Sequence, residues 1–234
     1  MAHTELTILE EEITRCTRCP RLVAYREQVA REKRRMYRDQ EYWGRPVPGF
    51  GDPNARILIL GLAPAAHGAN RTGRMFTGDR SGDFLYRTLY STGLASQPDS
   101  TRQGDGLTLR DVFISAACRC APPENRPALE EIRNCRAWLE RELDLLKNVR
   151  VVVALGRIAF DDYLTMLYEE GRIGRRAAFV FGHNRVHETA SGLPILISSY
   201  HPSQQNTQTG RLTLAMFHDV FVEARRLAEA ANSL

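Results

Sequence analysis

RILILGL, at residues 56–62, is the first of four short apolar runs that decide the fold of this chain. The others are VFISAAC at 112–118, VVVALG at 151–156 and PILISSY at 194–200. Each run is continuous rather than alternating, which is typical of strands buried on both faces of a parallel sheet. Stretches with helical spacing separate or follow them, at residues 82–92, 128–147, 157–168 and 212–231. This alternation predicts an α/β fold with a central parallel sheet.

The chain before the first run is helical in its spacing and then irregular. Residues 6–13 have helical spacing, and residues 21–38 form a charged stretch of alternating sign on a helical pattern. The segment EYWGRPVPGFGDPNA that follows is rich in proline and glycine, so it predicts a loop. The 234 residues contain no internal repeat, and we predict a single domain over residues 1–234.

The composition is that of a protein able to bury a core, with 43% hydrophobic and 26% charged residues. No apolar run approaches the roughly 20 residues that span a bilayer, and the acidic start is unlike a secretory signal. We therefore expect a cytoplasmic or nucleoid-associated protein without membrane contact. The net charge of +4 permits a nucleic-acid partner without demanding one. Nearly all basic residues are arginines, which reflects either a GC-rich genome or phosphate contact by guanidinium groups.

Two long loops follow the first and fourth predicted strands, at residues 61–82 and 201–213. In open parallel sheets, ligands bind at the carboxyl ends of the strands, where these loops begin. Both are rich in Gly, Pro, Asn, Thr and Ser, and both exceed the usual length of a connection. Neither GxGxxG nor GxxxxGK[ST] is present, which disfavours a nucleotide cofactor.

The first loop carries groups suited to ligand contact. Its glycines let the backbone approach a ligand closely, and its polar side chains include His67, Asn70, Arg71, Arg74 and Asp79. Phe76 is an apolar ring in a polar loop, so it either stacks on a flat ligand or fills the core beneath. His201, at the end of the fourth strand, either points into the same cleft or serves as a capping or core histidine. The polar run at 204–211 predicts a loop able to enter a groove of DNA.

Five cysteines without an export signal argue against a disulfide framework and favour metal ligation or redox chemistry. Cys16 and Cys19 form a CxxC, and Cys120 precedes Cys135 across a proline-rich turn. Four thiolates suit zinc or an iron–sulfur cluster. Zinc sites usually offer two tight pairs, whereas a cubane cluster accepts looser spacing.

Together these motifs resemble the uracil-DNA glycosylase superfamily, and within it the family-5 (type B) enzymes. The resemblance is carried by GLAPAAHGANRTGRMFTGD at 61–79, HPSQQNTQTGRLT at 201–213 and CRCAPPENRP at 118–127. It implies a three-layer α/β/α sandwich with a central four-stranded parallel sheet. It also implies a [4Fe–4S] cluster whose ligands are Cys16, Cys19, Cys120 and Cys135, and it leaves Cys118 spare.

The implied reaction assigns roles to individual residues. Breaking an N-glycosidic bond produces an anionic base and an oxocarbenium-like sugar. His201 matches the family's donor to the base oxygen, and Asp79 matches the carboxylate that stabilises the sugar cation and orients water. Asn125 matches a further polar active-site residue, although beside its prolines it also suits an Asx turn. The expected base and DNA contacts are Gly61, Leu62, Ala63, His67, Asn70, Gly73, Phe76, Ser203, Asn206 and Arg211.

The implied substrate is double-stranded DNA that contains deaminated bases, and the implied assembly is a monomer. The target base must leave the duplex to be reached. Phe76 would stack on that base, and Arg211 or Leu212 would fill the hole left in the helix.

One departure from the family pattern concerns substrate range. Strict uracil enzymes resemble GQDPY where this chain reads GLAPA at 61–65. Ala65 stands where their tyrosine blocks the 5-position of the pyrimidine, so we expect hypoxanthine and 5-substituted uracils to be accepted as well as uracil. Two alternatives stay open at this stage: a non-catalytic iron–sulfur module that binds nucleic acid, and a small zinc-bearing nucleotide hydrolase.

Overall fold

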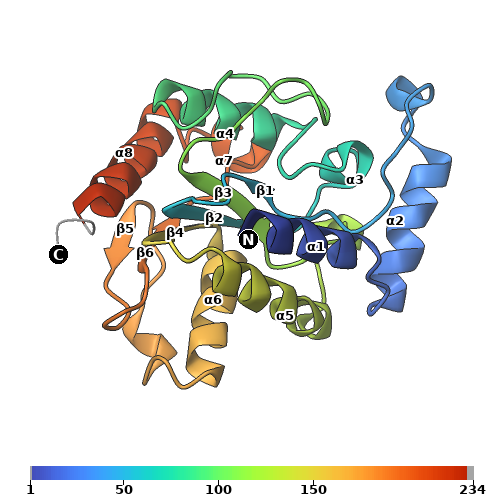
Figure 1. Cartoon of the computed structure of the whole chain (residues 1–234). Coiled ribbons are helices and arrows are strands. Elements are labelled where there is room, and N and C mark those ends of the chain that lie inside the picture. The colour runs from blue at the N-terminus through green and yellow to red at the C-terminus, as the bar shows by residue number, and fades with distance from the viewer. Residues whose placement is uncertain (1, 231–234) are drawn as a thin grey trace.

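The computed structural model describes residues 2–230 and builds them around one mixed sheet (Figure 1). Four parallel strands form its centre in the order β3-β2-β4-β6. They are β3 (Val112–Ala116), β2 (Ile57–Gly61), β4 (Val151–Leu155) and β6 (Ile195–Ser199). All four lie within the predicted apolar runs, and almost all of their residues are buried. The predicted central four-stranded parallel sheet is confirmed.

Two short antiparallel strands at the sheet edges were not predicted. They are β1 (Phe50–Gly51), which pairs with β3, and β5 (Arg185–His187), which pairs with β6. Both are only partly buried, and neither is long enough to produce a periodic pattern in the sequence. The complete sheet therefore has six strands.

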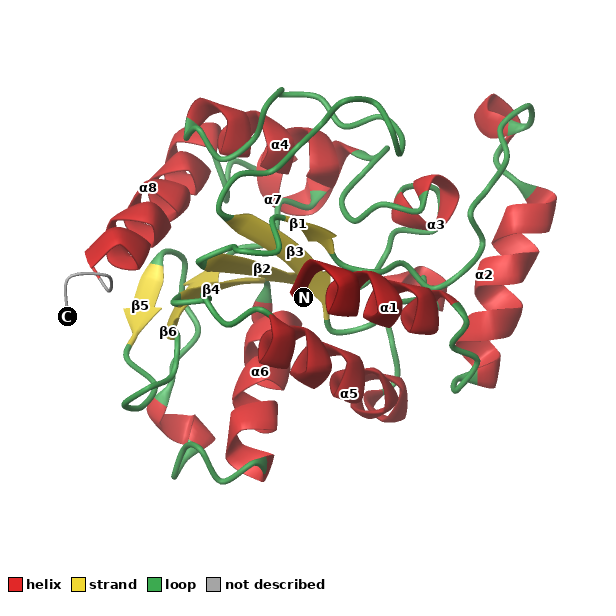
Figure 2. Cartoon of the chain, viewed as in Figure 1, coloured by secondary structure: helices red, strands yellow, loops and turns green. Residues whose placement is uncertain are grey.

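Helices cover both faces of the sheet (Figure 2). Successive residues of β2 point to opposite faces: Ile57 and Ile59 join one core cluster, and Leu58 and Leu60 join the other. The first cluster includes residues of α4 (Arg80–Ser91) and α8 (Leu214–Ala230). The second includes residues of α1 (Ala2–Thr14), α5 (Leu129–Leu145) and α6 (Arg157–Glu169). This arrangement confirms the three-layer α/β/α sandwich.

The predicted helices match these elements closely, with two qualifications. The last residue of the predicted helix 212–231 lies outside the described residues. The charged stretch 21–38 is not one helix. The helix α2 (Pro20–Glu32) ends within this stretch, and only the short turn η1 (Arg35–Tyr37) follows it. Lys33 breaks the helix with a left-handed φ of +52°, and Arg34 after it is extended.

Several small elements gather at the carboxyl ends of the parallel strands. They include α3 (Ala69–Thr72), which follows β2, η2 (Pro123–Asn125), which follows β3, and α7 (Gln204–Gln208), which follows β6. The remaining short turn, η3 (Arg176–Ala178), follows α6. Within residues 2–230, no helix has both the length and the apolar character needed to cross a bilayer.

Candidate active site and cysteine cavity

A cavity of about 460 Å³ opens at the carboxyl ends of β2, β3 and β6. This volume lies within the range of small-ligand sites. Its walls come from three separate segments that the topology brings together: residues 61–81, residues 116–125 and residues 201–205. Eight of the predicted site residues line it, namely Gly61, Leu62, Ala63, Phe76, Asp79, Asn125, His201 and Ser203. Ala65 lines it as well.

Asp79 is held at the start of α4, where it is the N-cap residue. Its Oδ1 accepts a hydrogen bond from the backbone N–H of Gly82 at 3.0 Å. Removal from water raises the pKa of the Asp79 carboxyl, while the backbone N–H groups of Gly82 and Ser81 oppose the rise. A carboxylate in such a setting carries its charge in a poorly solvated cavity, where it acts strongly on a nearby cation.

The second oxygen of Asp79 depends on a glycine for its place. A Cβ added at Gly68 would lie 2.1 Å from Asp79 Oδ2, which is far inside van der Waals contact. The backbone of Gly68 therefore forms the surface against which the carboxylate rests. This glycine fixes the direction in which Asp79 faces the cavity.

The aromatic rings of Phe76 and His201 together form one wall of the cavity. Their ring centroids are 5.9 Å apart, and the planes are inclined by 31°. The Phe76 ring lies so close to Gly61, at the end of β2, that a Cβ there would meet it at 2.9 Å. The ring also packs against the core cluster under α4. Phe76 thus both covers the core and presents an aromatic surface to the cavity.

His201 enters the cavity as an uncharged donor or acceptor. Burial lowers the pKa of its imidazole to about 4, so the ring is neutral near pH 7. Its own carbonyl is fixed by a hydrogen bond from Asn206 Nδ2 at 2.8 Å. Neither ring nitrogen has a hydrogen-bond partner in the described part of the chain, so both remain available to a bound molecule.

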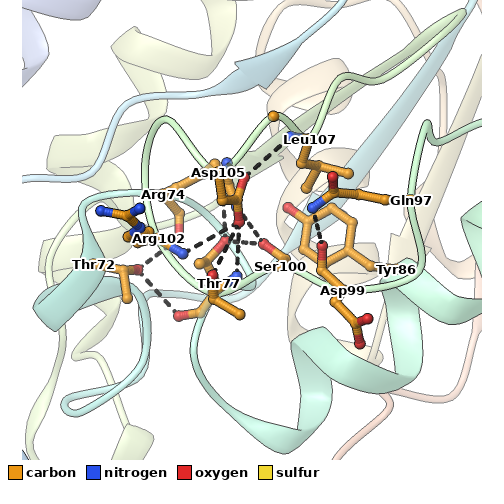
Figure 3. A network of polar contacts seen from close by, with 12 residues as sticks. Thr72, Arg74, Thr77, Tyr86, Gln97, Asp99, Ser100, Arg102, Asp105 and Leu107 are labelled. Carbon is orange, nitrogen blue, oxygen red and sulfur yellow. Dashed lines mark hydrogen bonds and ion pairs between the residues drawn. The ribbon is translucent and has the colours of Figure 1, made fainter.

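A buried polar network holds the segment that carries Phe76 (Figure 3). Arg74 forms an ion pair with Asp105 at 2.6 Å and also donates to Ser100 and Thr77. Burial disfavours ionisation of Asp105, but the hydrogen bonds from Arg74 and from backbone N–H groups outweigh it and hold its pKa below the usual range. The network attaches the loop at residues 61–82 to residues 97–107, and Arg74 lies behind the cavity wall rather than in the cavity.

Three of the predicted contact residues brace the first loop and do not line the cavity. His67 Nδ1 lies 3.0 Å from the hydroxyl of Tyr42. Asn70 is fully buried, and its Nδ2 donates to the carbonyl oxygens of Arg26 and Ala66. Gly73 lies directly against Trp43. In this structure these residues shape the loop from outside the cavity.

The segment after β6 also differs from expectation. The predicted loop at 204–211 begins with the short helix α7, whose N-cap Ser203 accepts from the N–H of Asn206 at 3.4 Å. Arg211 lies outside the cavity and stacks over Tyr200, with 4.6 Å between guanidinium and ring. Leu212 is 1% exposed and belongs to the core, so this structure does not present its side chain for insertion into DNA, and its role as a wedge stays a prediction.

The four cysteines predicted as ligands line a second, small cavity. They come from different segments: Cys16 follows α1, Cys19 is the N-cap residue of α2, Cys120 follows β3 and Cys135 lies on α5. Two N–H groups point at their sulfurs, from Arg26 to Cys120 at 2.9 Å and from Asn134 to Cys19 at 3.5 Å. The fifth, Cys118, does not line this cavity and is fully buried beside Cys135.

The four sulfurs do not converge as they would around one ion. Across residues 2–230, no three His, Cys, Asp or Glu side chains come together in a group able to hold a single metal ion. A cubane cluster contains four irons and four sulfides, and it is held from four sides by thiolates. The arrangement around the cavity wall, with N–H donors directed at sulfur, has the donor chemistry that such a cluster uses.

Comparison with known proteins agrees with this geometry. Residues 48–225 match the family model described as the uracil DNA glycosylase superfamily. The chain belongs to the uracil-DNA glycosylase superfamily. It is 55% identical over 218 residues to the type-5 uracil-DNA glycosylase of Thermus thermophilus, which covers 93% of this chain and 96% of that protein.

Two further relatives carry the same description. The type-5 uracil-DNA glycosylase of Mycobacterium tuberculosis is 52% identical over 217 residues, covering 92% of this chain and 79% of the relative. That of Pyrobaculum aerophilum is 46% identical over 222 residues, covering 95% and 92%. The family resemblance drawn from the motifs is confirmed.

The sequence analysis did not predict several of the residues that line the cavity. Arg80 and Ser81 line it because they follow the N-cap Asp79 into the first turn of α4. Gln204 and Gln205 line it from the first turn of α7. A signal was present in both cases, since Asp79 and Ser203 are residues that favour the N-cap position. Helix starts at these two positions would have placed all four side chains at the strand ends.

The contact between Gly68 and Asp79 gives a testable prediction for this superfamily member. If Asp79 acts in base release, Gly68→Ala is expected to reduce the single-turnover rate about tenfold, because the new methyl group displaces the Asp79 carboxylate from its place in the cavity. Gly174→Ala is the matched control, since nothing lies within 4 Å of a Cβ there. Equal rates for the two variants, at unchanged melting temperature, would show that Gly68 does not position Asp79.

Proposed function

We propose that this protein hydrolyses the N-glycosidic bond of uracil in double-stranded DNA and so starts base-excision repair. The observation that carries the proposal is that Asp79, His201 and Phe76 line the same cavity. A carboxylate, a neutral imidazole and an aromatic surface are what base release needs. The descriptions of the type-5 relatives support the same reaction.

The proposed reaction divides its two developing charges between two side chains. As the bond between C1′ and the base breaks, Asp79 stabilises the cationic sugar and orients the water that attacks C1′. The base leaves with the bonding electron pair, and a hydrogen bond from His201 to a base oxygen stabilises the anion. Water supplies the hydroxyl of the abasic sugar, and its remaining proton balances the charge of the departing base.

The other lining residues would bind and orient the extruded nucleotide. Phe76 offers a stacking surface, which is worth on the order of 1–3 kcal/mol per base. Asn125 is exposed and lines the cavity from the end of the short turn η2. We propose that its amide hydrogen-bonds to the base edge or to the attacking water. Ser203, Gln204 and Gln205 line the cavity at the start of α7, where they would contact the strand that delivers the base.

Incubation with duplex DNA that contains one uracil tests the proposal. We expect abasic sites from the wild-type protein, detected by strand scission in alkali, and none from the same duplex with thymine. A protein that binds the uracil duplex and leaves it intact would instead be the non-catalytic module.

We also propose that the cysteine cavity holds a [4Fe–4S] cluster through Cys16, Cys19, Cys120 and Cys135. When bound, such a cluster supplies folding free energy by joining segments that are distant in sequence. Here it would connect the α1–α2 turn to the segment after β3 and to α5. Arg26 and Asn134 would hydrogen-bond to two of the ligating sulfurs. No redox step is required for base release.

The substrate range is expected to be broader than uracil. Ala65 lines the cavity and leaves open a volume that a larger side chain would fill. A pocket that lacks a wall cannot reject a larger base. We therefore expect release of hypoxanthine and 5-hydroxymethyluracil as well as uracil from duplex DNA, whereas adenine and cytosine resist because they are poorer leaving groups in stable pairs.

Replacement of Ala65 tests this expectation. Ala65→Tyr is expected to reduce the activity on hypoxanthine relative to uracil at least ~10-fold, because the ring occupies the open volume. The measurement is abasic-site formation on matched uracil and hypoxanthine duplexes, with uracil release as the internal control. A wild-type protein that cleaves uracil alone would mean that another group closes this space.

A further inference from the structure

The turn that follows α2 forms a basic projection, which we define as residues 33–38. It contains Lys33 and three arginines, Arg34, Arg35 and Arg38, within six residues. The helix ends at Glu32, and the positive φ of Lys33 redirects the chain into the turn η1. Figure 1 shows this turn beyond the end of α2 and near α3, on the side of the sheet where the carboxyl ends of the parallel strands lie.

The basic projection is attached to the loop that carries Asp79. The Arg71 guanidinium lies over the Tyr37 ring at 4.0 Å and donates to Gln40 at 2.6 Å. The same guanidinium donates to the carbonyl of Gly78, the residue before Asp79, at 3.0 Å. The projection therefore has a fixed position relative to the active-site loop.

A second connection passes through Tyr42. Its hydroxyl accepts from the backbone N–H of Arg34 at 3.3 Å and lies 3.0 Å from His67 Nδ1. His67 belongs to the active-site loop, so both ends of the projection are tied to that loop. A fixed attachment of this kind is what a binding element needs and what a solvated charged tail lacks.

The three arginine charges of the basic projection are not neutralised within the described chain, whereas Lys33 Nζ donates to the carbonyl of Arg38 at 3.3 Å. Arg34, Arg35 and Arg38 are exposed, and in the described chain none of their guanidinium groups has a carboxylate within 4.0 Å. Other arginines are neutralised internally, as in the pairs Arg56–Asp111 and Arg136–Asp162. Acidic residues flank the turn at Glu32 and Asp39, which confines the excess of positive charge to the turn itself.

We propose that the basic projection binds phosphates of the DNA strand that flanks the extruded nucleotide. Planar guanidinium groups match phosphate oxygens in geometry and charge, and each contact releases condensed counterions from the DNA. The inference rests on the proposed function only in that duplex DNA is the bound substrate. The projection adds affinity and on-rate and takes no part in bond cleavage.

The experiment compares two double variants that each remove two positive charges. R34A/R35A removes charges from the projection. R110A/R175A is the matched control, because Arg110 and Arg175 are exposed and do not line the cavity. Like the arginines of the projection, neither has a carboxylate within 4.0 Å in the described chain, and Arg110 lies before β3, away from the carboxyl ends of the strands. Binding to a duplex of undamaged sequence and to one with uracil is measured across a range of salt concentrations.

We expect R34A/R35A to weaken binding to both duplexes by the same factor and to reduce the slope of log K against log salt by about 2, about 1 per contact. Single-turnover cleavage at saturating DNA stays within about twofold of wild type. The control keeps the wild-type slope. A slope unchanged from the control overturns the proposal, as does wild-type protein that does not bind DNA. If wild-type protein binds DNA without cleaving it, the proposed function fails, and the slope comparison still decides the role of the projection.

Discussion

Asp79→Asn is expected to lower the rate of uracil release at least ~100-fold while changing DNA affinity little. The substitution keeps the shape of the side chain and its Oδ1 as an N-cap acceptor for Gly82. It removes the negative charge that, in the proposed mechanism, faces the sugar. Because the carboxyl is poorly solvated, this charge is little screened, and its loss raises the barrier to formation of the sugar cation.

The measurement is single-turnover cleavage of a uracil duplex, with binding followed separately. Asp83→Asn is the matched control, since Asp83 lies one helical turn along α4, is exposed, and does not line the cavity. We expect wild-type rates from it. Wild-type rates in Asp79→Asn would exclude this mechanism.

The pH dependence follows from the same carboxyl. Burial raises the pKa of Asp79, and only the ionised form stabilises the sugar cation, so activity falls as the pH drops through the raised pKa. This acid limb therefore lies above the ordinary aspartate value of about 3.9. It should be absent from the residual activity of Asp79→Asn. His201, with its pKa lowered to about 4, stays neutral over most of the range.

The sequence was sufficient for the centre of the fold because each parallel strand is a short, continuous apolar run. Burial on both faces leaves no room for polar residues in β2, β3 or β4 except Ser115. The edge strands β1 and β5 were not predicted, because a strand of two or three partly exposed residues is too short to show a periodic pattern of apolar residues. Lys33 was also missed as a helix end, because lysine gives no composition signal for a left-handed conformation.

The sequence did not separate the residues that line the cavity from those that only support the loop, and the reason is physical. In a long polar loop, a side chain either faces the ligand or braces the loop, and both positions call for the same residue types. Asn70 and His67 turned out to brace, whereas Asp79 lines the cavity. Leu212, a candidate wedge from the sequence, is buried because the segment before α8 folds back onto the core. Only the path of the backbone separates these cases.

Replacement of any one of the four cavity cysteines is expected to remove the proposed [4Fe–4S] cluster altogether. Cys16→Ala, Cys19→Ala, Cys120→Ala or Cys135→Ala each leaves the cluster with three protein ligands, and each should give a colourless protein of low soluble yield. The physical reason is that cluster binding and folding are coupled when the ligands come from separate segments. Here they join α1, α2, the end of β3 and α5. Absorbance, iron content and melting temperature provide readouts independent of activity.

Cys118→Ala is the control that the chain itself offers, and it decides the assignment of the ligands. Cys118 is fully buried, more so than any of the four cavity cysteines, so loss of its side chain tests a general packing defect. Its sulfur lies beside Cys135 and outside the cavity that the other four line. We expect Cys118→Ala to keep the brown colour and full iron content with a modest loss of stability. A brown, fully loaded Cys120→Ala protein beside a colourless Cys118→Ala one would exchange the roles of these two cysteines, since both follow β3 and lie on either side of Arg119.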